Sequence, residues 1–557
     1  MPELFFQEQD QRVSVEAGVT ILQAARDAGI IIESPCDGVG TCGKCQVQLK
    51  DAAPGSWKCE EAHYQLPAEL QEQGYVLACH TKVYGDLIVV APNTAKQNKT
   101  LKILSEGESF QYEIKPWFQK VYAAPKGKTF VLAGGKKVGE EEGDTTKQFY
   151  GLAIDIGTTT LVTALIDMNT GEEIDSLSAL NPQSLHAQDV ITRIHMASKP
   201  EGLVLLYGAI RDEFNHTIQE LCKRNSIESR YIYEVIYSGN TTMIHLACNV
   251  NPEPLGQFPY TAVIRGGNTV PADDLEISPY GDIYLPPIIS AYVGPDITSG
   301  VLAAQLEKKK GTTLFIDIGT NGEMILAQDG KLAGTSTAAG PAFEGMNITC
   351  GMRAGNGALE LYQIQPDGTP KTHVIGDVKA SGICGSGLLD IIGELVRVGV
   401  IGKSGRLVKP DKGKYPDVLK AQMKEKDGKP VFYVAEEVYI TQSDIRQVQL
   451  AKGAIRAGVE MLMSALGVEA EHVDCVEIAG SFGYHLRESS LIDQGMLPEA
   501  FRGKVKFVGN TSKSGAKAFL LNQEVRTYME NLVDEIKDVE LSQDPKFQDV
   551  FVKALTF

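Results

Sequence analysis

The sequence contains one short pattern twice, and this repeat limits the possible folds more than any other feature. Residues 152–160 (LAIDIGTTT) and 314–324 (LFIDIGTNGEM) each run from apolar residues into Asp, Gly and hydroxyl side chains. A short apolar run that ends at glycine is typical of a buried strand entering a tight turn. Asp155 and Asp317 occupy equivalent positions, 162 residues apart. We therefore predict two similar α/β half-domains, each carrying one such loop.

The loop residues have the chemistry needed to bind a magnesium nucleotide. A carboxylate just beyond a strand can hold Mg²⁺ directly or through water, which is the role predicted for Asp155 and Asp317. Glycine lets the backbone approach phosphate oxygens closely, and threonine hydroxyls and turn amides can donate hydrogen bonds to them. The predicted phosphate contacts are Gly157, Thr158, Thr159, Gly319, Thr320 and Asn321.

Three further stretches complete the pattern. Residues 476–486 (VEIAGSFGYHL) are another apolar run into a Gly-Ser-Phe-Gly turn, and residues 293–306 and 508–521 have helical patterns. In this order the five elements resemble the two phosphate motifs, the adenosine motif and the hinge helices of the actin, sugar kinase and Hsp70 (ASKHA) superfamily. The resemblance implies a duplicated, two-lobed α/β ATPase domain over residues 149–557.

The superfamily resemblance also implies roles for particular residues. Gly480, Ser481 and Phe482 would contact the adenosine. Asp296, at the start of the first hinge helix, is similar in position to the residue that orients the attacking water, and Glu323 is the alternative for that role. Together these assignments place ATP and Mg²⁺ between the two lobes.

Half of the ten cysteines lie in the first 80 residues, and residues 1–92 have the strand and helix patterns of a small separate domain. Cys36, Cys42, Cys45 and Cys79 are separated by five, two and 33 residues. Glycines between the first three allow a loop to wrap closely around a cluster. The first gap is one residue longer than in plant-type ferredoxins. In this it resembles the adrenodoxin-like [2Fe-2S] ferredoxins, which implies a β-grasp fold.

A zinc site is the competing interpretation of these cysteines, because four thiolates also suit Zn²⁺. Zinc ribbons usually present two C-x2-C pairs, whereas this domain has one, formed by Cys42 and Cys45. The iron–sulfur interpretation is therefore favoured. Cys59 falls outside the ligand spacing and is expected to be an ordinary residue.

Charge and hydropathy exclude several classes of function. The net charge of −18 argues against a nucleic-acid-binding surface. No apolar run approaches the roughly 18 residues of a membrane span. The N-terminal residues lack the basic start and apolar core of a signal peptide. We therefore expect a cytoplasmic enzyme with neither a membrane nor a nucleic acid as partner.

Two charged stretches are predicted to lie outside the cores of the domains. Residues 93–148 are predicted to be a linker, in which 107–125 alternate as a strand does and 133–147 form a flexible loop rich in glycine and charge. Residues 403–439 are also charged and are predicted to be an excursion on the surface.

A ferredoxin domain ahead of such an ATPase resembles the reductive activators of corrinoid-dependent proteins and methyltransferases. The resemblance covers nearly the whole chain and includes residues 381–390 (SGICGSGLLD) and 443–452 (SDIRQVQLAK). It implies ATP-dependent reduction of Co(II) to Co(I) in a corrinoid protein, with the electron passing from the [2Fe-2S] cluster. It also implies a low-potential electron donor and a homodimer. Because only residues 93–148 precede the first phosphate loop, a middle domain present there in some relatives is expected to be lost or shortened.

Other functions remain open from the residues alone. One is a metabolite kinase fused to a ferredoxin, which would need a specific substrate pocket. Another is an electron carrier whose nucleotide fold is a vestigial scaffold, although the intact Asp155 and Asp317 weigh against it. Activators of 2-hydroxyacyl-CoA dehydratases are disfavoured, because their [4Fe-4S] cysteines lie inside the ATPase fold, whereas here the clustered cysteines precede it.

Overall fold

The computed structural model describes the chain except residues 31, 33, 35–37, 39–42, 44, 51, 61–65, 91–106, 108, 481–485 and 542–543. The chain divides into two compact units. The N-terminal unit contains residues 1–101 and 182–188, and the C-terminal unit contains residues 102–181 and 189–557. No helix in the described part of the chain is both long enough and apolar enough to cross a membrane.

The N-terminal unit is a mixed sheet with a helix packed on it, as the β-grasp prediction requires. The strand order is β2-β1-β7-β3-β5, with β1 parallel to β7 and the other pairs antiparallel. These strands are β1 (Glu3–Phe6), β2 (Gln11–Ser14), β3 (Gln46–Lys50), β5 (Tyr75–Leu77) and β7 (Leu87–Val90). Beside them lie the pair β4 (Trp57–Cys59) and β6 (Thr81–Val83), and α2 (Ala68–Glu72).

The helix α1 (Ile21–Asp27) supplies the apolar core of this unit. Thr20 caps it, because its side chain accepts a hydrogen bond from the backbone N–H of Gln23 at 3.2 Å. The apolar face of α1, which includes Ile21 and Leu22, is buried with residues of the sheet. The structure therefore has the helix and the strands that the patterns of residues 1–92 indicated.

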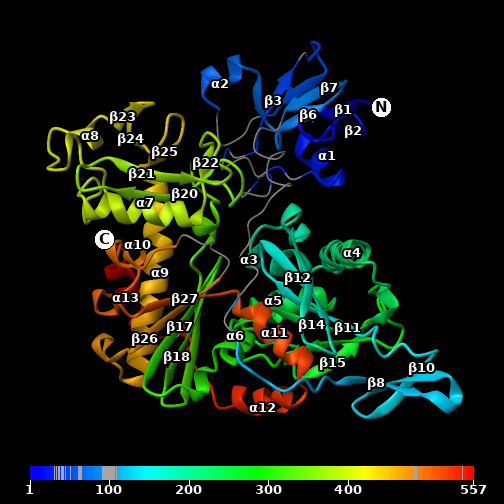
Figure 1. The fold of residues 1–557 in the computed structure, drawn as a ribbon. Helices are drawn as coiled ribbons and strands as arrows, with labels where there is room; N and C mark the ends of the chain where they lie inside the picture. Colours follow the sequence, from blue (N-terminus) through cyan, green and yellow to red (C-terminus); the bar gives the residue numbers. More distant parts are fainter. Residues whose placement is uncertain are drawn as a thin grey trace. The chain divides into compact units, whose positions relative to one another are not determined.

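The C-terminal unit contains two six-stranded sheets with one topology (Figure 1). The first lobe is built on the order β13-β12-β11-β14-β16-β15, and the second lobe on β19-β18-β17-β26-β27 with β28 added beside β19. In both lobes three antiparallel strands are followed by two parallel ones. The duplication inferred from the repeated loops is confirmed at the level of strand order.

The strands of the first lobe are β11 (Tyr150–Ile156), β12 (Thr160–Asp167), β13 (Glu173–Leu180), β14 (Ile232–Gly239), β15 (Asn268–Pro271) and β16 (Asp282–Leu285). Those of the second are β17 (Thr312–Ile318), β18 (Gly322–Gln328), β19 (Lys331–Thr337), β26 (Cys475–Ala479), β27 (Val505–Gly509) and β28 (Lys537–Asp538). The central strands are buried on both faces, which explains their near-continuous apolar sequences.

Two helices pack against each other between the sheets (Figure 1): α6 (Pro295–Ala304) and α11 (Thr511–Leu521). Each follows the last parallel strand of its lobe, and together they correspond to the two predicted hinge helices. Their approach depends on glycine, since a methyl group on Gly515 would overlap with the backbone carbonyl of Ser299. Close backbone contact of this kind fixes how the two helices cross.

The remaining helices cover the outer faces of the lobes. In the first lobe they are α3 (Val190–Ala197), α4 (Pro200–Asn225) and α5 (Thr241–Ala247). Later in the chain come α7 (Gly385–Arg397), α8 (Asp417–Lys420), α9 (Gln442–Leu466), α10 (Glu488–Asp493), α12 (Glu524–Val533) and α13 (Phe547–Ala554). A small sheet of β20 (Ala358–Ile364), β21 (Pro370–Val374) and β22 (Gly382–Ile383) packs on α7.

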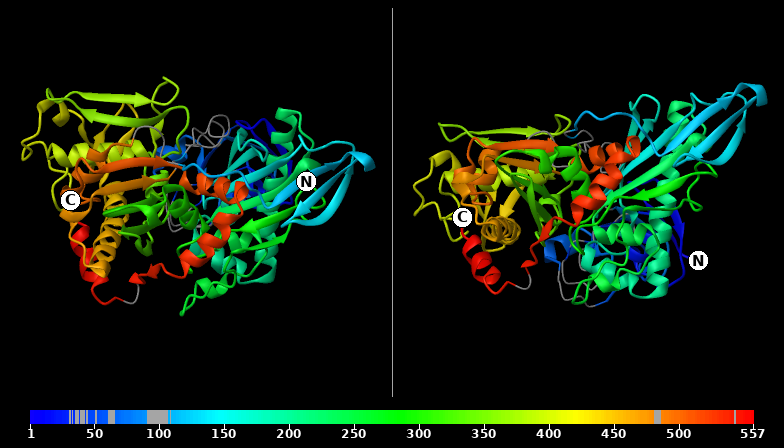
Figure 2. Two further views of the ribbon diagram at one scale, coloured as in Figure 1. Left: turned by 60° about the horizontal axis from the view of Figure 1, so that its bottom comes forward. Right: turned by 90° about the horizontal axis from the view of Figure 1, so that it is seen from below.

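The predicted linker contains a folded sheet in its described part, and the flexible loop assigned to residues 133–147 is wrong. Strands β8 (Phe118–Ala123), β9 (Lys128–Ala133) and β10 (Lys136–Glu142) form an antiparallel sheet that projects beyond the first lobe (cyan in Figure 2). The charges pair across strands, since Lys128 Nζ lies 2.7 Å from Glu140 Oε1. At the base, the ammonium of Lys120 contacts Glu141 and the Tyr233 hydroxyl, both at 2.8 Å.

The surface excursion predicted for residues 403–439 is also partly wrong. This segment contributes β23 (Met423–Lys426), β24 (Lys429–Tyr433) and the start of a third strand, β25 (Tyr439–Thr441). Leu419 and Phe432 are fully buried in the apolar core of the second lobe. The high charge of the segment belongs to its turns and outer strand, whereas its few apolar residues anchor it.

Candidate nucleotide and cluster sites

The two repeated loops leave equivalent strands, β11 and β17, through equivalent tight turns. The backbone N–H of Gly157 donates to the carbonyl of Thr160 at 2.9 Å, and that of Gly319 donates to the carbonyl of Asn321 at 2.8 Å. A Cβ on Gly157 would lie 2.6 Å from the Thr160 carbonyl oxygen, so this turn requires glycine. Asp155 and Asp317 are the last but one residues of β11 and β17, so they lie inside the strand ends and not just beyond them as predicted.

The carboxylate of Asp155 is held by the second hinge helix. Ser512 Oγ donates to Asp155 Oδ1 at 2.7 Å, and Asn510 Nδ2 donates to Oδ2 at 2.8 Å. Asn510 also caps α11, because its side-chain oxygen accepts from the N–H of Lys513 at 2.9 Å. One capping residue therefore starts the helix and orients a carboxylate of the first lobe.

Four carboxylates share the space at these strand ends: Asp155, Asp296, Asp317 and Glu323. Burial, and after it the neighbouring charge of Asp155, raise the pKa of Asp317 to about 7. Burial first, and then Asp317, raise the pKa of Asp296. Burial, Asp296 and Asp317 together raise the pKa of Glu323 well above its ordinary value. The pKa shifts show that these carboxylates act on one another at short range.

The register of the second sheet explains part of this crowding. Asp317 lies directly opposite Glu323 in the antiparallel pair β17–β18. Glu323 is only 6% exposed. Asp296 stands in the first turn of α6, and its side chain accepts from the N–H of Ile297 at 2.9 Å. Asp296 and Glu323, the two residues predicted for the catalytic role, thus belong to the same cluster of carboxylates as Asp317.

The arrangement fits a hydrated divalent cation. Ionising Asp317 among like charges is costly, and no basic side chain in the described part of the chain offsets its charge. In that same part, no three His, Cys, Asp or Glu side chains are placed to hold a metal ion by themselves. Mg²⁺ would therefore complete its coordination with water and phosphate oxygens, which is its usual behaviour.

The loop threonines are buried and engaged. Thr159 Oγ1 and Thr320 Oγ1 donate to the two carboxylate oxygens of Glu344, which ends the short 3-10 helix η6 (Pro341–Glu344). Thr158 Oγ1 accepts from Asn240 Nδ2 at 3.1 Å. Asn240 is the cap of α5, because its side-chain oxygen accepts from the N–H of Met243 at 3.0 Å. Glu344 was not predicted, because a single Glu in a glycine-rich loop has no distinguishing pattern.

Arg193 is a second residue that the sequence did not single out. It is fully buried on α3, and its Nη2 donates to the backbone carbonyl of Thr158 at 2.6 Å. Burial lowers the pKa of its guanidinium to about 9, while Asp189 and Glu344 act in the opposite direction. The only feature of the sequence that could have indicated Arg193 is a basic residue on the face of the helix that is buried.

The predicted adenosine turn begins beside the second hinge helix. The backbone N–H of Gly480 donates to the carbonyl of Gly509 at 3.2 Å, and Gly480 has a positive φ of 117°. Ser481 and Phe482 lie outside the described residues. Gly480 thus lies beside Gly509, which directly precedes Asn510, the cap of α11. A nucleotide bound at the start of α11 would be compatible with this position.

In the N-terminal unit, two of the four predicted cluster ligands come together. Cys45 and Cys79 are 1% and 9% exposed, and their sulfur atoms are 3.1 Å apart. The N–H of Ala78 donates to the carbonyl of Cys45 at 2.8 Å, which fixes the two segments side by side. Cys36 and Cys42 lie outside the described residues. Cys59 is exposed on β4.

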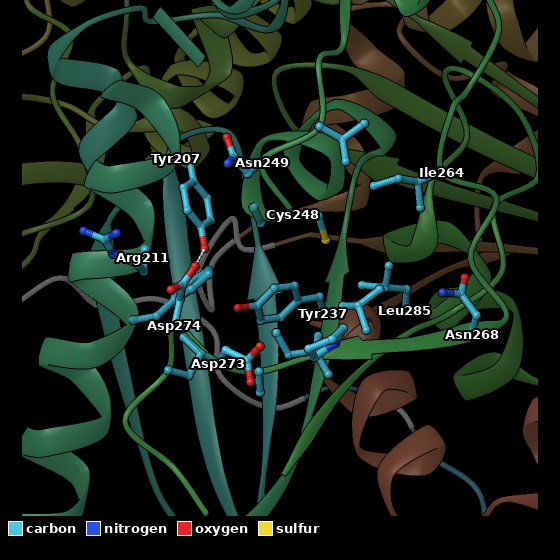
Figure 3. Close-up of a pocket in the computed structure, with 18 of the residues that line it drawn as sticks. Tyr207, Arg211, Tyr237, Cys248, Asn249, Ile264, Asn268, Asp273, Asp274 and Leu285 are labelled. Atoms are coloured by element: carbon cyan, nitrogen blue, oxygen red, sulfur yellow. Dashed lines mark hydrogen bonds between the residues drawn. The ribbon is translucent and has the colours of Figure 1, made fainter. Parts of the chain in front are cut away.

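A separate cavity of 530 Å³ lies on the outer face of the first-lobe sheet (Figure 3). Tyr207 on α4 donates a hydrogen bond from its hydroxyl to Asp274, and Tyr237 on β14 lines the interior. The next residue, Ser238, points to the opposite face, where its hydroxyl contacts Ser299 and Ser512 at 2.9 Å. The sheet therefore separates this cavity from the carboxylates.

Fold and site together define an iron–sulfur domain joined to a two-lobed ASKHA-type domain, and comparison with known families agrees. Residues 4–84 match the family described as "2Fe-2S iron-sulfur cluster binding domain". Residues 150–309 match "RACo middle region", and residues 311–557 match "C-terminal domain of RACo the ASKHA domain". The chain belongs to the RACo family, the reductive activators of corrinoid proteins.

Individual relatives extend this similarity over the whole chain. "Corrinoid activation enzyme RamQ" from Eubacterium limosum is 29% identical, with 98% of both chains covered. "[Co(II) methylated amine-specific corrinoid protein] reductase" from Methanosarcina barkeri is 24% identical over 67% of this chain and 70% of its own. The solved structure described as "Reductive activator for corrinoid,iron-sulfur protein" is 32% identical, with a TM-score of 0.73 and coverage of 100% and 98%.

The match to "RACo middle region" coincides with the first lobe, which carries the first phosphate loop, and begins after the stretch of residues 93–148. The chain covers 98% of the solved activator. That residues 93–148 take the place of a further domain found in some relatives stays a prediction.

Proposed function

We propose that this protein is an ATP-dependent reductive activator that returns the cobalt of a corrinoid protein from Co(II) to Co(I). The proposal rests on two features found in one chain. The buried thiols of Cys45 and Cys79 converge, and a cluster of like-charged carboxylates lies between the two lobes. The printed activities of the two curated relatives support the same reaction.

The electron balance of the reaction is simple. The reduced [2Fe-2S] cluster would give up one electron, which the cobalt of the partner accepts. Each ~59 mV of unfavourable potential difference costs a factor of ten in the equilibrium of a one-electron transfer. Bound ATP can offset such a gap only by interacting differently with two states of the activator and its partner.

The residues of the two sites have separate roles, one set binding the cluster and the other binding Mg²⁺ and ATP. Cys36, Cys42, Cys45 and Cys79 would hold the cluster. Asp155 and Asp317 would hold Mg²⁺ through its water and phosphate ligands. The phosphates would be contacted by Gly157, Thr158, Thr159, Gly319, Thr320 and Asn321, and the adenosine by Gly480, Ser481 and Phe482.

Asp296 is the residue we assign to orienting the attacking water. It sits at the start of α6 beside Asp317, and burial with neighbouring charges raises its pKa, which favours acceptance of a proton. Glu323 shares this environment and is the alternative.

Two rival functions are less well supported. A metabolite kinase needs an acceptor pocket facing the phosphates, and the 530 Å³ cavity of the first lobe cannot serve as one because it lies across the sheet from them. A vestigial nucleotide fold would be expected to lose carboxylates that repel one another, since such groups destabilise the fold when no ligand compensates them. We further propose a low-potential electron donor, a homodimer and a cytoplasmic location.

The direct experiment is an anaerobic spectrophotometric titration. The full chain, a chemical reductant and a corrinoid protein in the Co(II) state are mixed with and without Mg·ATP. Co(I) should accumulate only when the activator and ATP are both present. Equal reduction without nucleotide would indicate a simple electron carrier. ATP consumption only with phosphorylation of a small metabolite would indicate a kinase.

A further inference from the structure

Glu344 joins the two phosphate loops to each other. Thr159 follows β11 of the first lobe, and Thr320 follows β17 of the second lobe. The hydroxyl of Thr159 donates to Glu344 Oε2, and the hydroxyl of Thr320 donates to Glu344 Oε1. A single carboxylate therefore connects the loops across the interlobe space.

The same hydroxyls are the ones assigned to phosphate. A threonine hydroxyl has one proton to donate, so it cannot donate to Glu344 and to a phosphate oxygen at once. Both threonines are more than nine-tenths buried, and water has little access with which to replace a lost partner. Glu344 and nucleotide phosphate are thus alternative acceptors for the same two donors.

A fixed positive charge favours an anion in this position. Arg193 is fully buried, and its guanidinium donates to the carbonyl of Thr158, next to Thr159 in the first loop. Glu344 is among the groups whose negative charge acts on it. Because phosphate also carries negative charge, exchanging one anion for the other preserves the balance with Arg193.

The segment that carries Glu344 is bounded by two glycines. The short helix η6 lies between Gly340, with φ of 81°, and Gly345, with φ of 79°. Side chains other than glycine rarely adopt these angles. The N–H of Gly340 also donates to the carbonyl of Thr320 at 2.8 Å. The second phosphate loop is therefore linked through one hydrogen bond to the segment that carries Glu344.

From this geometry we infer that Glu344 is an internal competitor of nucleotide phosphate and a positioning residue for both loops. Without nucleotide its carboxylate accepts hydrogen bonds from both Thr159 and Thr320 and so holds the two loops together. When ATP binds, the hydroxyls transfer to phosphate oxygens and the Glu344 side chain turns away, while η6 stays packed against α7 and α9. This inference rests on the proposed ATP site, and it assigns Glu344 a regulatory part in loading that site.

The test compares full-length wild type with Glu344→Ala and Glu344→Gln. Affinity for a fluorescent ATP analogue is measured with Mg²⁺ at equilibrium, without reductant or corrinoid protein. Removing the competitor should tighten binding about tenfold or more in Glu344→Ala, because hydrogen bonds to a charged acceptor are lost from the free state only. Glu344→Gln, which keeps the shape but not the charge, should show a smaller gain.

A second readout does not involve nucleotide. Amide hydrogen exchange in residues 155–160 and 317–322 of the nucleotide-free protein should be faster in Glu344→Ala, since the two loops are no longer held together. Glu360→Ala is the control: Glu360 is another carboxylate of the second lobe, 6% exposed where Glu344 is half-buried, but it pairs with His373. Neither affinity nor loop exchange should respond to it.

The possible outcomes separate this inference from the proposed function. Unchanged or weaker binding in Glu344→Ala, with wild type binding normally, would overturn the competitor role alone. Absence of nucleotide binding in wild type would overturn the ATP site itself. If Glu344→Ala does not fold, Glu344→Gln decides, and an affinity equal to wild type would count against the inference.

Discussion

Asp317 and Glu323 face each other across the antiparallel strands β17 and β18, with Asp296 close enough to affect the ionisation of Glu323. Such a pairing of like charges has no structural benefit in a nucleotide-free protein. It becomes favourable when a cation and its ligands share the space. The cluster of carboxylates therefore links the stability of the fold to the occupancy of the nucleotide site.

The first prediction concerns this link and pH. Because the pKa of Asp317 rises from 3.8 unfolded to about 7 in the folded state, the folded state binds more protons between these values. Stability of the nucleotide-free protein should therefore fall as pH increases through this window, and the loss should be complete above about pH 7. Thermal unfolding at pH 6 and pH 8 measures the difference.

Asp317→Asn removes the titrating group and should raise the apparent Tm at pH 8 by a few degrees. The matched control, Asp411→Asn, changes an exposed aspartate far from the loops in sequence and should have little effect. A stability that increases from pH 6 to pH 8, or the same response in both variants, would show that repulsion within the cluster of carboxylates does not destabilise the folded protein.

The second prediction concerns the cluster ligands. Cys79→Ala removes a buried sulfur adjacent to Cys45 and should abolish the cluster, whereas Cys59→Ala changes an exposed residue and should not. Iron and acid-labile sulfide analysis, together with the S = 1/2 electron paramagnetic resonance signal after reduction, reports both results. Stoichiometric zinc without sulfide would contradict the iron–sulfur assignment.

The third prediction separates binding from turnover at Asp296. Asp296→Asn keeps the size of the side chain but cannot accept a proton from water. ATP affinity should be nearly unchanged, while ATP hydrolysis should fall by ~10²–10⁴-fold. If hydrolysis is unaffected in Asp296→Asn but lost in Glu323→Gln, the assignment moves to Glu323.

The fourth prediction concerns the crossing of the hinge helices. Gly515→Ala places a methyl group against the Ser299 carbonyl, so the helices must separate, at a cost of about 1–3 kcal/mol. Gly208→Ala is the control, because Gly208 lies on α4 with open space around it. Chemical denaturation should show a loss of stability for Gly515→Ala and a neutral or slightly positive effect for Gly208→Ala.

Local patterns in the sequence predicted the elements whose chemistry is self-contained. The strand–Asp–Gly–Thr loops and the two hinge helices each depend on residues close together in the chain. The shared strand order of the two lobes is consistent with the two half-domains predicted from the repeated loops, and Cys45 and Cys79 belong to the predicted set of cluster ligands. These features could be predicted because burial and turn chemistry leave a periodic trace in the sequence.

Features that depend on distant partners were missed. Residues 133–147 looked flexible because Lys and Glu are usually solvated, yet Lys128, Glu140 and Lys120 find partners only after β8, β9 and β10 pair. Glu344 has no local signature, since its role comes from two threonines that lie 185 and 24 residues away in sequence. Only the folded chain brings these side chains together.

The central claim is that the nucleotide site controls delivery of an electron from the cluster. It is tested most directly by measuring Co(I) formation with wild type and Asp317→Ala, matched for cluster content and fully reduced beforehand, in the presence of Mg·ATP. We predict that the variant retains its cluster spectrum yet forms almost no Co(I), because its site no longer supports ATP turnover. Formation of Co(I) by Asp317→Ala at the wild-type rate would contradict the account.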